Sequence, residues 1–224
     1  MHDLLFDMDG TLYDFKKSES VCLEKVFREA DIAYTDEMIA RYQSVNHRLW
    51  DEYEKGLVSQ SYVENERMQL FFDEIGCRKD GHKAASDYVD YLSQTDFMID
   101  GAKDFLKKIK DSRRLFIITN GIAKTQYGRL RNSSTMDFYD RVFISGEIGL
   151  QKPDKAFFDY VMKEGCIARE NAIVIGDSEK SDIMGARNAG MKSIFISFDR
   201  KGSDLADYSV SSYEELYSLI IDLN

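Results

Sequence analysis

The sequence is poor in cysteine, histidine and proline. Its 224 residues include 3 cysteines, 3 histidines and a single proline, Pro153. The cysteines lie far apart and form no C-x-x-C pair, at Cys22, Cys77 and Cys166. This pattern argues against a disulfide framework and predicts free thiols in a reducing compartment. The histidines are equally scattered, which argues against a histidine-rich zinc site.

The sequence also lacks long apolar runs and basic runs. No stretch approaches the ~20 apolar residues of a membrane-spanning helix, and the N-terminal residues do not resemble a secretory signal. The formal net charge of -10 opposes binding to nucleic-acid polymers or to anionic membranes. We therefore expect a cytoplasmic protein that acts on a small molecule, and no obligate protein partner is evident. An acidic protein that handles an anionic substrate needs local positive groups or a metal ion.

Short apolar runs that end in polar residues or glycine recur along the chain. These predicted strands are Leu4–Phe6, Leu115–Ile118, Val142–Ile144, Ala172–Ile175, Ser193–Ile196 and Tyr208–Val210. Helical patterns lie between and after the later runs, at Lys155–Lys163, Ile183–Ala189 and Tyr213–Leu223. Continuous apolar strands that alternate with helices indicate an α/β protein whose parallel sheet is covered on both faces.

The segment from about Phe15 to Thr95 has a different pattern and contains no convincing strand. Its apolar residues recur at three- and four-residue spacing in four predicted helices, Ser18–Ala30, Asp36–Lys55, Ser61–Ile75 and Lys83–Ser93. Candidate N-caps and terminal glycines bound these helices, at Thr35, Ser59, Asp80, Gly56 and Gly76. We therefore predict a core of residues 1–14 and 97–224, interrupted by a helical insertion of residues 15–96.

The stretch LLFDMDGTLYD places two aspartates one residue apart at the end of a strand. A hairpin turn at Asp9-Gly10 is disfavoured because the following residues do not alternate as a returning strand should. A calcium loop counted from Asp7 lacks the required Gly and Glu at its sixth and twelfth positions. Asp7 and Asp9 lean to the same side of the strand, where each raises the pKa of the other unless a cation lies between them. Mg²⁺ commonly bridges carboxylate and phosphate, so the pair predicts a metal site and a phosphoryl substrate.

Two other parts of the predicted sheet are followed by polar residues. FIITNG ends in Thr119, Asn120 and Gly121, which suit a phosphate cradle, although Thr-Asn-Gly is also an ordinary turn. Lys152 comes just before Pro153, and a residue before proline is extended, which can aim the lysine away from the following helix. Its ammonium would offset the charge of the aspartates and of phosphate, unless it is a solvated surface lysine.

The stretch AIVIGDSEKSD ends a strand at Gly176 and presents two more carboxylates, Asp177 and Asp182. Asp177 would complete the metal site opposite Asp7. Asp182 could ligate the metal through water, hold Lys152 by charge, or act at a helix N-terminus. Because ligands of open α/β sheets bind at the carboxyl ends of the strands, these residues predict a single site.

These motifs together resemble those of the haloacid dehalogenase-like (HAD) hydrolases. DMDGT at Asp7–Thr11 is similar to the first motif of that family, Thr119 to the second, Lys152 to the third and GDSEKSD at Gly176–Asp182 to the fourth. The resemblance implies a Rossmann-like, doubly wound parallel sheet as the core. It also implies an all-helical cap domain inserted after the first motif.

Three longer stretches resemble the pyrimidine 5'-nucleotidases of this family: Leu49–Gly56, Thr119–Ser133 and Gly149–Val161. The resemblance implies hydrolysis of nucleoside 5'-monophosphates with Mg²⁺ as the cofactor. The expected metal ligands are Asp7, Asp9 through its backbone carbonyl, Asp177 and Asp182. The expected substrate-binding residues are Gly10, Asn120, Gly121, Gln126 and Arg129.

The hypothesis for the chemistry assigns separate roles to the two aspartates of the first motif. Asp7 attacks phosphorus and forms an aspartyl-phosphate, while Lys152 neutralises charge and Thr119 contacts the phosphoryl group. Asp9 protonates the departing oxygen and then deprotonates the hydrolytic water. Specificity is expected from the cap, where Trp50 and Tyr53 either stack on a base or belong to the helical core.

Other functions share parts of this pattern. A phosphatase of another small phosphometabolite, such as phosphoglycolate or a sugar phosphate, would use the same catalytic residues. A phospho-accepting signalling domain also combines acidic residues, Thr and Lys on a doubly wound sheet, but it needs neither the helical insertion nor Asp9. A dehalogenase would need neither Asp9 nor Mg²⁺, and a phosphomutase would return the phosphoryl group to a sugar phosphate.

Overall fold

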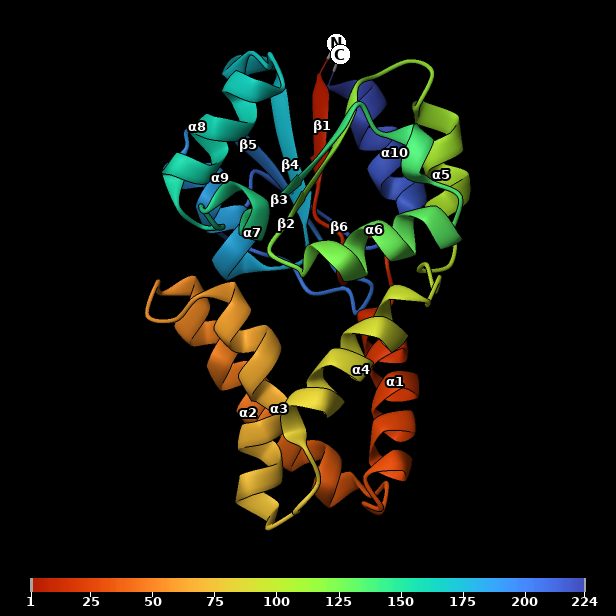
Figure 1. The fold of residues 1–224 in the computed structure, drawn as a ribbon. Helices are drawn as coiled ribbons and strands as arrows, with labels where there is room; N and C mark the ends of the chain where they lie inside the picture. The colour runs from red at the N-terminus through yellow and green to blue at the C-terminus, as the bar shows by residue number, and fades with distance from the viewer. Residues whose placement is uncertain (1, 224) are drawn as a thin grey trace. The chain divides into compact units, whose positions relative to one another are not determined.

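The computed structural model describes residues 2–223, and its strands form one six-stranded sheet (Figure 1). The strand order is β3-β2-β1-β4-β5-β6, and every neighbouring pair is parallel. The strands are β1 (Asp3–Phe6), β2 (Leu115–Thr119), β3 (Arg141–Ile144), β4 (Ala172–Gly176), β5 (Lys192–Ile196) and β6 (Tyr208–Val210). Every predicted strand is present, with each end within one residue of its predicted position.

Helices cover both faces of this sheet (Figure 1). The longer ones are α5 (Ala102–Ile109), α8 (Lys155–Glu164), α9 (Met184–Asn188) and α10 (Tyr213–Asp222). Successive side chains of β1 point to opposite faces of the sheet, because side chains alternate along a strand. Leu5 belongs to a buried cluster with Phe157 and Phe158 of α8, whereas the ring of Phe6 lies 6.0 Å from the ring of Phe105 on α5. The predicted doubly wound α/β core is therefore confirmed.

Short helical segments complete the connections between strands. They are α7 (Ser145–Ile148), the 3₁₀ turns η1 (Met136–Phe138) and η2 (Arg169–Asn171), and a π-helical turn, η3 (Glu179–Ile183), that runs directly into α9. The chain after β4 therefore turns at once into helix, and this brings the aspartates of the fourth motif close to the strand end.

The chain divides into two compact units, which are described separately. The first contains the sheet and comprises the chain up to Phe15, Phe97–Gly121 and the chain from Ser133 onward. The second comprises Lys16–Asp96 and Ile122–Asn132. The predicted boundaries of core and cap stay a prediction, and they did not anticipate that residues 122–132 pack with the inserted helices.

The second unit is built from helices throughout its described residues. These are α1 (Phe15–Glu29), α2 (Asp36–Glu54), α3 (Gln60–Ile75), α4 (Gly81–Ser93) and α6 (Ala123–Asn132). The predicted N-caps Thr35, Ser59 and Asp80 each accept a hydrogen bond from a backbone N–H in the first turn, as N-caps do. Gly76 ends α3 with a left-handed φ of 71°, a conformation that glycine adopts without steric cost.

The helix α6 approaches α4 closely. A Cβ atom on Gly128 would lie 2.2 Å from the carbonyl oxygen of Ser93, so only glycine permits this packing distance. The side chain of Asn132 then donates to the same carbonyl at 3.0 Å. This contact ties the segment after β2 to the helical unit.

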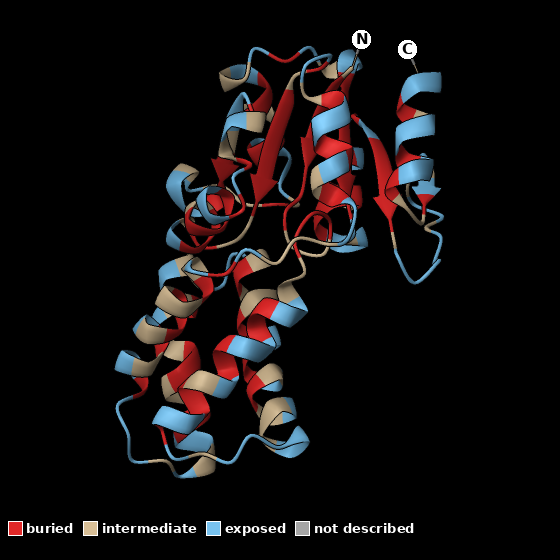
Figure 2. Cartoon of the chain, turned by 90° about the vertical axis from the view of Figure 1, so that its right-hand side faces the viewer, coloured by how far each residue is buried: buried red, intermediate tan, exposed pale blue. Residues whose placement is uncertain are grey.

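Burial follows the pattern expected for each kind of element (Figure 2). The strands β1, β2 and β4 are buried along their whole length, whereas the longer helices bury one side. Within the described residues, no helix is both long enough and apolar enough to span a membrane.

Candidate active site

Three neighbouring strands deliver the candidate site residues to one edge of the sheet. The strand β1 lies between β2 and β4, with Phe6 in register with Ile117 on one side and Ile175 on the other. Asp7 directly follows β1, Thr119 is the last residue of β2, and Asp177 directly follows β4. The parallel arrangement therefore brings these side chains to the same edge, as the strand-end pattern predicted.

Lys152 is the centre of the buried charges in this unit. Its side chain is 1% exposed, and its Nζ donates to Oδ1 of Asp7 at 2.6 Å, to Oδ1 of Asp182 at 2.6 Å and to the carbonyl oxygen of Ile118 at 3.0 Å. Burial alone would lower the pKa of the ammonium, but the carboxylates of Asp182 and Asp7 raise it above its usual value. Lys152 is therefore a charged residue of the site and does not lie on the surface.

The carboxylates of Asp7, Asp177 and Asp182 form an acidic cluster whose ligand oxygens lie within 4.8 Å of one another. Burial raises the pKa of Asp7 well above its usual value, Lys152 opposes this shift, and the other two carboxylates add to it. Asp177 keeps solvent access, yet the surrounding protein, together with Asp182, raises its pKa to about 7. These pKa shifts mean that the single positive charge of Lys152 does not balance the negative charges of three carboxylates.

The donor set of this cluster fits Mg²⁺. Three carboxylates offer hard oxygen ligands, and a divalent cation would remove the mutual repulsion that Lys152 leaves. Asp9 follows Asp7 by two residues in a tight loop, in which the N–H of Gly10 donates to the carbonyl oxygen of Tyr13 at 2.9 Å. The part of Asp9 in the metal site stays a prediction.

Two glycines make room for the carboxylates. Gly10 has a φ of +88°, and a Cβ atom there would lie 2.2 Å from Oδ2 of Asp177. A Cβ atom on Gly176 would lie 2.2 Å from Oδ2 of Asp182. The absence of a side chain at Gly10 permits the close approach of the Asp177 carboxylate, and the substrate binding predicted for Gly10 stays a prediction.

Asp182 occupies one of the three arrangements that the sequence allowed. It contacts Lys152, and its Oδ2 also accepts from the backbone N–H of Ser178 at 3.1 Å. The N-cap of the π-helical turn is Ser178, whose side chain accepts from the N–H of Ser181. The charge contact with Lys152 is therefore present, and the role of Asp182 as a metal ligand stays a prediction.

The Thr-Asn-Gly segment after β2 forms a turn and also holds the lysine loop. Oγ1 of Thr119 accepts from the N–H of Gly121 at 3.0 Å. The side chain of Asn120 donates from Nδ2 to the carbonyl oxygen of Lys152 at 2.9 Å, and its Oδ1 accepts from the N–H of Lys152 at 3.0 Å. This reciprocal pair fixes the backbone of Lys152, and the phosphate contacts predicted for Thr119, Asn120 and Gly121 stay a prediction.

Gln126 and Arg129 lie on α6 in the helical unit, where both are fully buried. Nη1 of Arg129 donates to Oε1 of Gln126 at 3.0 Å. Their predicted role in substrate binding therefore stays a prediction. Tyr53 is buried, Trp50 is half-buried, and their rings lie 5.8 Å apart, so packing in the helical unit is present and stacking on a base stays a prediction.

Thr11 also contributes to the acidic cluster, which was not predicted from the sequence. Thr11 is fully buried, its Oγ1 donates to Oδ1 of Asp177 at 3.4 Å, and its carbonyl oxygen accepts from the hydroxyl of Tyr213 at 2.6 Å. The position of Thr11 in the DMDGT motif indicated that it lies near the site. Its hydrogen bond to Asp177 could not be predicted, because the distance between them depends on tertiary packing.

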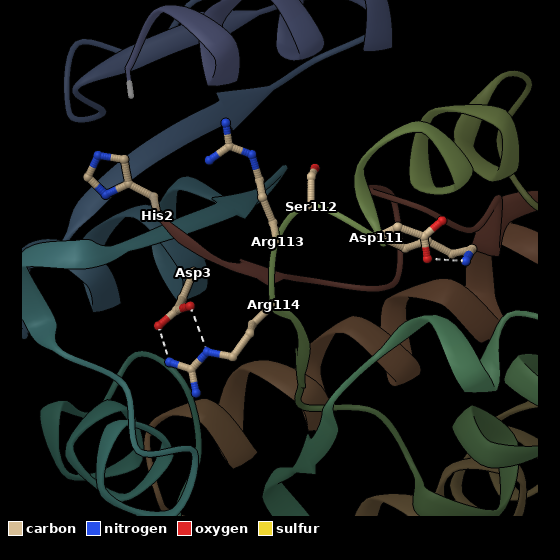
Figure 3. Close-up of a pocket in the computed structure, with 7 residues that line it drawn as sticks. His2, Asp3, Asp111, Ser112, Arg113 and Arg114 are labelled. Atoms are coloured by element: carbon tan, nitrogen blue, oxygen red, sulfur yellow. Dashed lines mark hydrogen bonds and ion pairs between the residues drawn. The ribbon is translucent and has the colours of Figure 1, made fainter.

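The opposite edge of the sheet carries a separate pocket of about 420 Å³ (Figure 3). Asp3 begins β1, and Arg114 directly precedes β2. Arg114 forms two hydrogen bonds with the Asp3 carboxylate, one from Nη2 and one from Nε at 2.9 Å. Each carboxylate of this pocket is therefore paired with a cation, Asp3 with Arg114 and Asp111 with Lys110, unlike the clustered carboxylates at the carboxyl ends of the strands.

Comparison with known proteins gives a consistent result. The family model of the haloacid dehalogenase-like hydrolases matches residues 4–196. The HAD-hydrolase YfnB of Bacillus subtilis is 34% identical over 97% of this chain and 94% of its own length. The pyrimidine 5'-nucleotidase PynA of Streptococcus pneumoniae is 34% identical over 95% of this chain and 92% of its own. YjjG of Escherichia coli, also a pyrimidine 5'-nucleotidase, is 28% identical over 97% of this chain and 96% of its own.

A crystal structure of YfnB bound to magnesium superposes with a TM-score of 0.92 and covers 98% of both chains. The fold, the motif order and these relatives agree, so the predicted family is confirmed. The chain belongs to the haloacid dehalogenase-like hydrolases and is an enzyme of that family.

Proposed function

We propose that this hydrolase removes the phosphate of nucleoside 5'-monophosphates, with a preference for pyrimidine nucleotides. The observation that carries the proposal is the buried Lys152, bonded at 2.6 Å to both Asp7 and Asp182, beside a third carboxylate of the cluster. This arrangement suits phosphoryl transfer, which needs a nucleophile, cationic charge and metal-ligating oxygens at one place. The substrate class is supported by the names of PynA and YjjG, both pyrimidine 5'-nucleotidases.

Asp7 is the proposed nucleophile. Lys152 contacts its Oδ1, so Oδ2 would attack phosphorus. The new bond joins Oδ2 to phosphorus, and the bond between phosphorus and the 5'-oxygen of the nucleoside breaks. Lys152 stays protonated because its pKa is raised, and its charge opposes the rise that burial causes in the pKa of Asp7.

Asp9 is the proposed acid and base. It would give a proton to the departing 5'-oxygen, which leaves the nucleoside neutral. In the second step Asp9 would take a proton from water, whose oxygen attacks phosphorus and releases phosphate and Asp7. Thr119 and the N–H groups that follow it would bind the phosphoryl oxygens in both steps.

The proposal includes a Mg²⁺ site held by Asp7, Asp177 and the backbone carbonyl of Asp9, with Asp182 placed to contribute indirectly. When bound, Mg²⁺ supplies positive charge to the phosphoryl oxygens and offsets the repulsion between phosphate and the carboxylates. The chain itself orients this site, since Gly10 admits the Asp177 side chain and Thr11 donates to it.

The proposal is tested by phosphate release from a substrate panel with and without Mg²⁺. The panel contains UMP, CMP, dTMP, AMP, GMP, phosphoglycolate, ribose 5-phosphate and glucose 6-phosphate. We expect Mg²⁺-dependent hydrolysis, with kcat/KM highest for the pyrimidine nucleotides. Equal or faster hydrolysis of phosphoglycolate or the sugar phosphates would instead identify a phosphatase of another metabolite.

A further inference from the structure

Tyr213 of α10 is a buried residue that the proposed mechanism does not use. Its side chain is 5% exposed, and its hydroxyl donates to the carbonyl oxygen of Thr11 at 2.6 Å. The two residues are 202 positions apart in the sequence, and both belong to the unit that contains the sheet. This hydrogen bond therefore joins α10 to the loop of the first motif, which also contacts the carboxylate of Asp177.

The Asp177 carboxylate packs against two neighbouring residues of this loop. Oγ1 of Thr11 donates to Oδ1 of Asp177 at 3.4 Å, and a Cβ atom on Gly10 would lie 2.2 Å from Oδ2. The hydrogen bond from Thr11 is already long, so a small further separation would break it. A shift in the opposite direction would press the loop backbone against the carboxylate. The position of the loop backbone therefore decides how the side chain of Asp177 is oriented.

The loop closes into a tight turn and is then held from outside. Within the turn, the N–H groups of Leu12 and Tyr13 both donate to the carbonyl oxygen of Met8, at 3.0 and 2.9 Å. These bonds fix the shape of the turn but not its position on the sheet. From outside, the N–H of Ile99 donates to the carbonyl oxygen of Leu12 at 3.0 Å, and the hydroxyl of Tyr213 provides a second bond. Of these two, the tyrosine acts on the residue whose side chain contacts the carboxylate.

The ring of Tyr213 is itself held on several sides. It stacks on the ring of Phe105 with 5.3 Å between the ring centres, where α5 and α10 lie side by side (Figure 1). The ring of Phe198, from the segment after β5, also lies 5.3 Å away, and a Cβ atom on Gly101 would lie 3.3 Å from Cδ2 of the tyrosine. Burial raises the pKa of Tyr213, so its hydroxyl stays protonated and can donate. The packed ring therefore places this donor at a defined position.

We propose that Tyr213 is a positioning residue of the active site, which keeps Asp177 in the orientation that binds Mg²⁺ by holding the backbone of Thr11. The path consists of two hydrogen bonds, from Tyr213 to the carbonyl oxygen of Thr11 and from Oγ1 of Thr11 to Asp177. Without the tyrosine hydroxyl, the buried carbonyl loses its donor and the loop shifts toward another partner. Partners that orient a metal ligand in this way contribute to metal affinity. The inference rests on the proposed function, because Asp177 is a metal ligand in that proposal.

Binding of Mg²⁺ alone tests the inference without catalysis. Tyr213→Phe keeps the packed ring and removes only the hydroxyl. Titration calorimetry should show that it binds Mg²⁺ about 3- to 10-fold more weakly than the unmodified enzyme, a loss similar to that of one hydrogen bond. The matched control is Tyr217→Phe, which removes the hydroxyl of an exposed tyrosine one helical turn further along α10. It should change the Mg²⁺ affinity by less than about twofold.

Hydrolysis gives a second readout, which a merely structural role would not move. In Tyr213→Phe the Mg²⁺ concentration for half-maximal rate should rise by about 3- to 10-fold, while kcat at saturating Mg²⁺ stays within about twofold of the unmodified enzyme. A residue that only supports the fold would lower the stability of the protein and leave its Mg²⁺ requirement unchanged. That result would overturn the inference.

A double-mutant cycle tests the path through Thr11. Thr11→Val removes the hydroxyl that contacts Asp177 and should weaken Mg²⁺ binding, whereas Thr11→Ser keeps a hydroxyl and should bind Mg²⁺ like the unmodified enzyme. The double variant of Tyr213→Phe and Thr11→Val should bind Mg²⁺ about as tightly as Thr11→Val alone, because the effects of residues that act through one another do not add. Losses that multiply in the double variant would show that Tyr213 acts by another path and would overturn the inference.

The results separate this inference from the proposed function. If Tyr213→Phe does not fold, Phe198→Ala takes its place, because it keeps the hydroxyl and removes one of the rings that hold it. This variant should weaken Mg²⁺ binding by about twofold or more, and unchanged binding would overturn the inference. If the unmodified enzyme itself binds no Mg²⁺, the proposed metal site fails and the inference fails with it. If the unmodified enzyme binds Mg²⁺ and the variants bind it equally well, the inference alone fails.

Discussion

The ammonium of Lys152 lies 2.6 Å from Oδ1 of Asp7 and 2.6 Å from Oδ1 of Asp182, and all three side chains are buried. Lys152, of the third motif, thus binds both Asp7 of the first motif and Asp182 of the fourth. The reciprocal hydrogen bonds between Asn120 and the backbone of Lys152 add the second motif. Four strand-end segments that are distant in the sequence therefore hold one buried charge network.

Replacement of the nucleophile should remove turnover but not the fold. Asp7→Asn keeps the size of the side chain and removes its negative charge, so attack on phosphorus is lost. We expect activity to fall by at least about 1,000-fold, as loss of a nucleophile does, with a single cooperative thermal transition retained. Initial rates and thermal unfolding of the same preparation measure both effects, and substantial residual hydrolysis would exclude Asp7 as the nucleophile.

Loss of the buried lysine should reduce both stability and activity. Lys152→Met leaves the carboxylates of Asp7 and Asp182 close together without their cation, and breaking a buried ion pair in this way costs about 3–5 kcal/mol. Chemical denaturation measures the change in the free energy of unfolding. The control is Lys155→Met, which removes a lysine paired with Asp159 at the surface and should have little effect. Equal stability of the two variants would contradict the network.

A methyl group at Gly10 should disturb the Asp177 side chain. In Gly10→Ala the new Cβ atom would meet Oδ2 of Asp177 at 2.2 Å, so the carboxylate must move. We expect lower activity and a higher Mg²⁺ concentration for half-maximal rate. Gly76→Ala is the matched control, because Gly76 also has a positive φ, +71°, but has nothing within 4 Å of its Cβ position. It should lose about 1 kcal/mol of stability and keep its Mg²⁺ requirement.

Removal of the metal should stop hydrolysis reversibly. Treatment with EDTA should abolish activity, and added Mg²⁺ should restore it, while Ca²⁺ should not, because its larger and more flexible coordination suits phosphoryl transfer poorly. Asp177→Asn should raise the Mg²⁺ concentration for half-maximal rate by about 10-fold or more, because it removes one charged ligand. Full activity in the presence of EDTA would contradict the metal site.

The sequence predicted those parts of the structure that depend on local pattern. The apolar runs located β1, β2 and β4, and the side chains of Thr35 and Ser59 located helix starts, because strands and N-caps depend on neighbouring residues. Other features depend on contacts between distant segments. Examples are the paired hydrogen bonds of Asn120 with Lys152 and the approach of Gly10 to Asp177.

In the helical unit, too, contacts between distant segments could not be predicted from the sequence. The apolar spacing of α3 predicted its helix but did not distinguish Arg67 from the exposed charged residues of the same segment. Its burial follows from packing beside Tyr42 and Tyr88, on helices that the sequence could not pair. Gly128 likewise gave no sign that α6 would pack on Ser93 of α4.

The central claim is that Asp7 carries the phosphoryl group for a short time during hydrolysis of a nucleotide. The direct measurement is rapid acid quenching of the enzyme during UMP turnover, followed by mass spectrometry of its peptides. We predict one phosphoryl group on the peptide that contains Asp7, which appears and decays within a turnover and is absent in Asp7→Asn. The absence of a phosphoryl group from this peptide would contradict the mechanism. A phosphoryl group that persists on this peptide long after UMP is exhausted would likewise contradict its role as an intermediate of hydrolysis.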